Sequence, residues 1–177
     1  MSRPPTLVVL VAVLMIALGE TGGAVMSQLR PQLDRYARAR VTASPQAHGL
    51  AGSAEYDDDI AARVVFTVEA GLSFFHTHAE GVGLVTFAAG TLVASLVPWR
   101  RPRGALYALI VAGALFPLGY LVYGAVVLQA GLDAGVELAE RYVLTPLGSA
   151  MITALVGLLL LALFGRRASR GTPGPEA

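Results

Sequence analysis

Two histidines and a glutamate lie close together in a long apolar stretch, and their side chains could bind a metal ion or a haem. They are His76, His78 and Glu80. Successive residues of an α-helix are rotated by about 100°, so His76 and Glu80 lie about 40° apart, whereas His78 lies about 160° from His76. Glu69 shares the face of His76. A straight helix therefore presents His76 and Glu80 to one ion, but it does not present both histidines.

A metal site needs further ligands from another helix. Glu20, in the first apolar segment, could complete a site with His76 and Glu80. Histidine and carboxylate ligands are typical of zinc, iron, manganese and copper(II) sites. The sequence therefore indicates a transition metal ion as one candidate cofactor.

Haem b is the second candidate cofactor, because a histidine is a common axial ligand of haem iron. His76 or His78 would provide the axial nitrogen. The other apolar segments contain no histidine, so a bis-histidine haem would need a homodimer. Within one chain, the sixth ligand would be Met26 or Met151.

The composition is that of a membrane protein. The chain has 177 residues, of which 55% are hydrophobic and 14% are charged, whereas soluble domains average about 25% charged residues. The absence of cysteine excludes disulfides, thiolate metal sites and iron–sulfur clusters. The net charge of +1 gives no indication of nucleic-acid binding. No catalytic motif for a nucleophile, a phosphate or a zinc protease is present, so an enzyme is not favoured.

Four apolar segments each contain the ~20 residues that a helix needs to cross a hydrocarbon core of ~30 Å. Backbone groups in lipid must pair within the segment, and the segments lack the alternation of a membrane barrel. The predicted fold is all-α, a polytopic four-transmembrane-helix bundle whose helices project beyond the outer face. The predicted spans are residues 6–26, 77–99, 104–128 and 143–164.

The second apolar stretch is longer than a membrane is thick. Residues 64–99 would form a helix of about 54 Å at ~1.5 Å per residue. We expect this helix to begin near Asp59 and to project outward, with residues 62–75 packed against the first and fourth helices. Pro31 is expected to end the first helix. The outer loop is predicted at about residues 30–59, and its His48 is assigned no role.

The arginines predict the orientation. Arg3 and the clusters at residues 100–103 and 166–170 lie at alternate segment ends, and short cytoplasmic loops are rich in positive charge. Both termini are then cytoplasmic, and residues 166–177 form a disordered tail. Arginine without lysine is typical of GC-rich bacteria, which suggests the bacterial inner membrane. Alternatively, the first segment is a cleaved signal peptide and three spans remain.

Polar residues of all four segments fall at a similar depth, near the outer boundary. Ionisable residues in a membrane are costly and usually face the bundle interior or a water-filled cavity. We therefore expect His76, Glu80 and Glu20 to point inward and approach one another, and His78 to face elsewhere. The supporting residues of this predicted site are Tyr120, Tyr123, Arg141 and Tyr142, of which Tyr123 or Arg141 should lie close to His76.

Several functions agree with these patterns. The favoured one is a small membrane protein with a polar His/Glu site, which acts as a non-catalytic binding or accessory subunit. Its expected partners are the lipid bilayer and either further copies of the chain or a larger membrane complex. The alternatives are a haem- or metal-binding redox protein, a transporter that works as an oligomer, and interfacial polar residues with a purely structural role.

Overall fold

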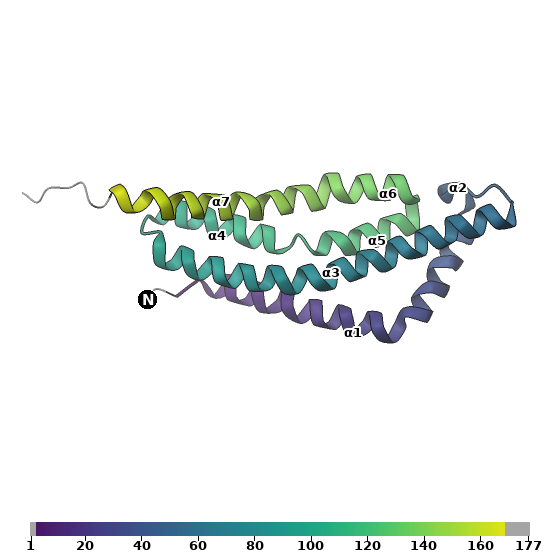
Figure 1. Ribbon diagram of the computed structural model, residues 1–177, viewed down its shortest axis with the longest axis horizontal. Helices are drawn as coiled ribbons and strands as arrows, with labels where there is room; N and C mark the ends of the chain where they lie inside the picture. The colour runs from purple at the N-terminus through teal and green to yellow at the C-terminus, as the bar shows by residue number, and fades with distance from the viewer. Residues whose placement is uncertain (1–2, 169–177) are drawn as a thin grey trace, which may run out of the picture.

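The structure is a computed structural model that describes residues 3–168, with side chains through Phe164. Within that part of the chain the secondary structure is helical, and no strand occurs. Four helical rods lie side by side (Figure 1), and each is long and apolar enough to cross a membrane. The predicted fold is confirmed: the chain is an all-α, polytopic membrane protein built as a four-helix bundle.

The first two rods are the long helices α1 (Thr6–Ala43) and α3 (Ala54–Leu96), which lie against each other (Figure 1). Helix α3 is unbroken through residues 62–75, as the apolar stretch predicted. It begins earlier than Asp59, because Asp57 accepts hydrogen bonds from the backbone N–H groups of Ala51 and Gly52, at 2.8 and 3.0 Å. These bonds fix the turn that enters the helix.

The prediction that Pro31 ends the first helix is wrong. Pro31 lies inside α1, which bends sharply in its second half (Figure 1). A proline in a helix removes one backbone hydrogen bond and kinks the axis. Beyond the bend, Arg38 of α1 bonds to Asp58 of α3 at 2.8 Å. The residues predicted as outer loop are therefore largely helical, and they include the short helix α2 (Pro45–His48).

The third rod is interrupted where the sequence predicted a continuous span, and the fourth rod changes its helix type at the start of its predicted span. The third consists of α4 (Arg100–Ala114) and α5 (Leu118–Ala130), which are separated by a turn that ends at Pro117. The fourth consists of α6 (Leu132–Ala139), a π-helical turn at Glu140–Leu144, and α7 (Thr145–Ala168). Pro146 follows the π-helical turn and lacks the N–H of a regular helix.

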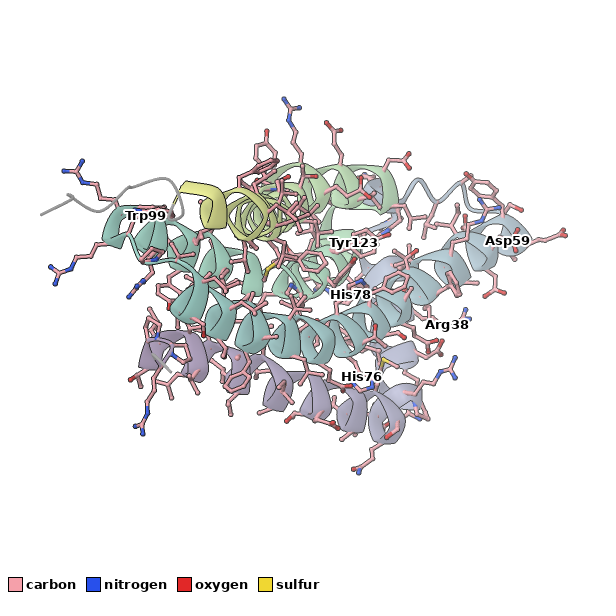
Figure 2. The ribbon with its side chains drawn as sticks, turned by 60° about the vertical axis from the view of Figure 1, so that its left-hand side comes forward. Arg38, Asp59, His76, His78, Trp99 and Tyr123 are labelled. Atoms are coloured by element: carbon pink, nitrogen blue, oxygen red, sulfur yellow. The ribbon has the colours of Figure 1, made fainter. Side chains whose placement is uncertain are left out.

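The bundle has two distinct ends. Figure 1 shows the start of α1, the junction of α3 with α4 and the end of α7 at one end, which carries Trp99 (Figure 2). The other end, which we call the α2 end, contains α2, the start of α3 and the turn between α5 and α6. Helix α7 includes residues 166–168, and the rest of the predicted disordered tail lies outside the described residues.

The core near the α2 end differs from the predicted packing. Val64 and Val68 of α3 are buried with Ala37 of α1 and Val127 of α5. The projecting part of α3 therefore packs mainly against the first and third rods, and the fourth rod contributes only partly buried residues such as Val136 of α6. Continuous burial along α3 makes this helix the central element of the bundle.

Candidate functional site: a polar groove between α1 and α3

A groove of about 810 Å³ lies between α1 and α3, on the side of the Pro31 bend that faces the middle of the bundle. We call it the α1–α3 groove. Its apolar walls include Met26, Phe66 and Phe74. Its polar side chains come from both helices: Glu20, Ser27, Arg30, Glu69, Ser73 and His76. A recess with apolar walls and a few polar groups is the usual form of a small-molecule site.

His76 connects the two helices. Its Nδ1 atom lies 2.9 Å from the backbone oxygen of Gly19 in α1. A carbonyl oxygen only accepts hydrogen bonds, so Nδ1 carries the hydrogen and donates it. Oε1 of Glu80 lies 2.6 Å from the same nitrogen, but away from the N–H direction, and this buried oxygen has no hydrogen-bond partner. His76 and Glu80 thus lie together, as their spacing predicted.

Two glycines of α1 allow this contact. A Cβ atom added at Gly23 would lie 2.7 Å from Cε1 of His76, which is too close for two carbon atoms. A Cβ atom at Gly19 would lie 3.1 Å from the backbone nitrogen of Glu80. Small residues let helix backbones approach closely in membranes. Here the approach is what brings the His76 ring within hydrogen-bond distance of the α1 backbone.

An ion pair closes the other end of the groove. Nε and Nη2 of Arg30 donate to the two carboxylate oxygens of Glu69, at 2.9 and 2.8 Å. These hydrogen bonds hold the pKa of Glu69 below its ordinary value. The Glu69 side chain is 19% exposed, whereas that of Arg30 is 70% exposed. The sequence placed Glu69 on the face of His76, but Arg30 was assigned to a loop and was therefore missed.

Glu20 lines the same groove as His76, but it is exposed and does not point into the interior as predicted. Its carboxylate makes no hydrogen bond or ion pair with the residues that the structure describes. Gly19 occupies the position of α1 that faces α3, so the next residue is rotated by about 100° toward the rim. Among residues 3–168, no three His, Asp or Glu side chains could hold a metal ion. The predicted three-ligand metal set is therefore not assembled.

His78 faces the other side of α3 (Figure 2). Its Nδ1 atom lies 2.8 Å from the backbone oxygen of Phe74, on its own helix. Its ring centroid lies 5.0 Å from that of Tyr120 and 5.5 Å from that of Phe116, next to the break between α4 and α5. The two histidines therefore diverge, as the helical angle predicted, and His78 belongs to an aromatic cluster.

None of the four predicted supporting residues lines the α1–α3 groove. Tyr120 and Tyr123 line a separate cavity of about 510 Å³, together with Glu140 of the fourth rod. Arg141 lies 3.6 Å from Glu137 of its own rod and stacks over the ring of Tyr142. The expectation that Tyr123 or Arg141 lies close to His76 is thus not met, because α3 lies between the groove and the rods that carry these two residues.

The two methionines considered as haem ligands lie in different places. Met26 lines the α1–α3 groove with His76. Met151 is buried at Gly113, where a Cβ atom would collide with its backbone. Only Met26 therefore shares a site with a histidine of the apolar helix.

His48 is a residue that the sequence did not single out. It is only 7% exposed, and its Nε2 atom lies 3.3 Å from the backbone oxygen of Leu128 in α5. The contact holds α2 over the end of α5. Its Nδ1 atom is buried without a partner among the described residues. The residues around His48 are small and polar, and this pattern does not indicate that His48 is buried.

No protein-family model matches the chain, and neither a curated protein nor a solved structure is significantly similar to it.

Proposed function

We propose that this chain is a non-catalytic binding or accessory protein of the bacterial inner membrane, and that it binds an amphiphilic ligand in the α1–α3 groove. The observation that carries the proposal is the groove itself, where apolar walls surround His76 and Glu20 at one end and the Arg30–Glu69 ion pair at the other. Apolar walls suit a hydrocarbon chain, and the polar groups suit a headgroup.

The depth of the groove supports an amphiphile. Trp99 marks one membrane interface, because tryptophan favours the headgroup level. Glu80 lies nineteen residues before Trp99, or about 29 Å along the helix, which is close to the ~30 Å hydrocarbon thickness. Gly19 is level with Glu80, so Glu20 and His76 lie at the opposite boundary of the membrane. A ligand at that boundary meets hydrocarbon on one side and water on the other.

The orientation is part of the proposal. The arginine clusters at the Trp99 end support a cytoplasmic position for both termini, and the groove then opens at the outer face. A reporter that works only in the cytoplasm should be active when it is fused after residue 164. A reporter that works only outside the cytoplasm should be active when it is inserted at Gly49. Gly49 is exposed and has open space around it, so the loop tolerates an insertion. The opposite pair of results would reverse the orientation.

The binding function is tested by filling the groove. Ala70 lines the groove, and Val85 is an exposed residue of the same helix that does not. Native mass spectrometry of the full chain, released from detergent, should show a co-purified amphiphile. Ala70→Trp should reduce its occupancy about tenfold, which corresponds to about 1.4 kcal/mol, whereas Val85→Trp should retain it. An empty wild-type protein, or equal occupancy in both variants, would contradict the proposal.

A further inference from the structure

We propose that the ligand is a phospholipid of the outer leaflet whose headgroup carries a primary ammonium, and that Glu20 and His76 accept its hydrogen bonds. This inference rests on the proposed function, because it names the ligand of the same groove. It begins with Glu20, which has no hydrogen-bond or ion-pair partner among residues 3–168. A carboxylate at the membrane boundary, with no cation of the described chain beside it, is available to pair with a cationic headgroup.

The charges of the groove favour a cation. Arg30 and Glu69 neutralise each other through two hydrogen bonds. His76 lies next to Glu80, so a charged imidazole would compensate only that carboxylate. Glu20 remains uncompensated in either case, and the groove has a net negative charge. An anionic headgroup such as phosphoglycerol is repelled there, whereas a headgroup with a positive end is attracted.

The hydrogen-bonding groups favour a primary ammonium over a quaternary one. In the neutral ring of His76, Nδ1–H donates to Gly19, so Nε2 is an acceptor. Nε2 makes no hydrogen bond within the described part of the chain, and His76 lines the groove. An ammonium has three N–H donors that match Nε2 and the Glu20 carboxylate, whereas a trimethylammonium has none.

The depth of Glu20 and His76 favours a lipid over a soluble amine. Gly19 is level with Glu80, so the two acceptors lie at the membrane boundary, where lipid headgroups are found. We therefore assign the occupant to the bilayer and not to a free amine in solution.

A competition between lipids tests this inference. The full chain is placed in mixed micelles at about pH 8. The micelles contain equal amounts of phosphoethanolamine, phosphocholine and phosphoglycerol lipids with the same acyl chains, and bound lipid is measured by native mass spectrometry. We expect the phosphoethanolamine lipid to be enriched about tenfold, as one charge-assisted hydrogen bond predicts. Glu20→Gln should abolish the enrichment without abolishing lipid binding.

Glu137→Gln is the matched control, because Glu137 lies on the fourth rod, outside the groove, and is exposed. Its only ion pair among the described residues is a weak one with Arg141 of the same rod, at 3.6 Å. It should retain the enrichment. Equal binding of the three lipids by the wild type, or enrichment that persists in Glu20→Gln, would overturn the inference and leave the proposed function intact. A wild-type protein that binds no lipid would overturn both. Retention of ethanolamine alone, in a parallel sample without lipid, would identify a soluble amine as the ligand and also overturn the inference.

Discussion

Nδ1 of His76 lies 2.6 Å from a carboxylate oxygen of Glu80, one turn along the same helix, and yet it donates its hydrogen to the backbone of α1. The ring is therefore held between two helices in one orientation. Nδ1 contacts Gly19 and Glu80, the ring packs on Gly23 at Cε1, and His76 lines the groove. This arrangement makes His76 both a link between α1 and α3 and a lining residue of the groove.

The two histidines should differ in their effect on binding. His76→Ala removes one hydrogen bond between helices, worth about 1 kcal/mol, together with an acceptor in the groove. His78→Ala removes the hydrogen bond to Phe74 of its own helix and the ring contacts of the aromatic cluster, none of which reaches the groove. Both variants should melt at a lower temperature in detergent, but only His76→Ala should lose co-purified lipid. Equal loss of lipid in the two variants would show that His76 acts through stability alone.

The Arg30–Glu69 ion pair predicts a loss of stability in acid. Arg30 lowers the pKa of Glu69 from its ordinary value of 4.5. A carboxylate with a lowered pKa stabilises the folded state above that ordinary value, and the stabilisation disappears as the pH falls through the folded-state pKa. The melting temperature should therefore fall as the pH drops below about 4.5.

Glu69→Gln should melt lower than the wild type at neutral pH and should show a smaller fall in acid. Glu137→Gln is the control, since Glu137 and Arg141 are both more than two-thirds exposed and contribute little. Thermal unfolding in detergent, followed by circular dichroism, measures both variants. An acid response of Glu69→Gln that equals that of the wild type would assign the effect to other carboxylates.

The properties of a single helix could be predicted from the sequence, because they depend on local spacing. The apolar run predicted that α3 continues through residues 62–75. The rotation of about 100° per residue predicted that His76 and Glu80 share a face and that His78 does not. Pro31 was predicted incorrectly, because ion pairs such as Arg38–Asp58 hold the helix against α3 beyond the kink.

The relations between helices could not be predicted in the same way. Depth along the membrane places Glu20 level with His76, but it does not fix the rotation of α1 about its own axis. Close contacts at Gly19 and Gly23 set that rotation, and they turn Glu20 to the rim. Arg141 likewise shares the depth of His76, yet its rod lies on the other side of α3. Two residues at the same membrane depth are thus less certain to lie close together than two residues on the same face of one helix.

The purified protein should be colourless and should lack stoichiometric iron, copper or zinc. His76 and His78 point to opposite sides of α3, and no three metal-ligating side chains converge in the described part of the chain. Absorbance spectra of the purified protein test for haem. Elemental analysis of the same protein tests for bound iron, copper or zinc. A Soret band, or one metal ion per chain that is lost in His76→Ala, would favour the redox alternative.

Gly23→Ala should disturb the site through a single added carbon. That carbon would lie 2.7 Å from Cε1 of His76 and 3.0 Å from Nε2, so the ring must move away from Gly19. Alanine is otherwise favoured over glycine in a helix by about 1 kcal/mol. Gly81→Ala is the matched control, because it lies in α3 with open space around it. We expect Gly81→Ala to keep or raise the melting temperature and to keep bound lipid, whereas Gly23→Ala loses lipid.

Nitrogen-15 NMR of the histidines should show the Nδ1–H form of His76 in the wild type and in Gly81→Ala, and its loss in Gly23→Ala. An unchanged His76 spectrum in Gly23→Ala would show that α1 and α3 do not approach as closely as the groove requires.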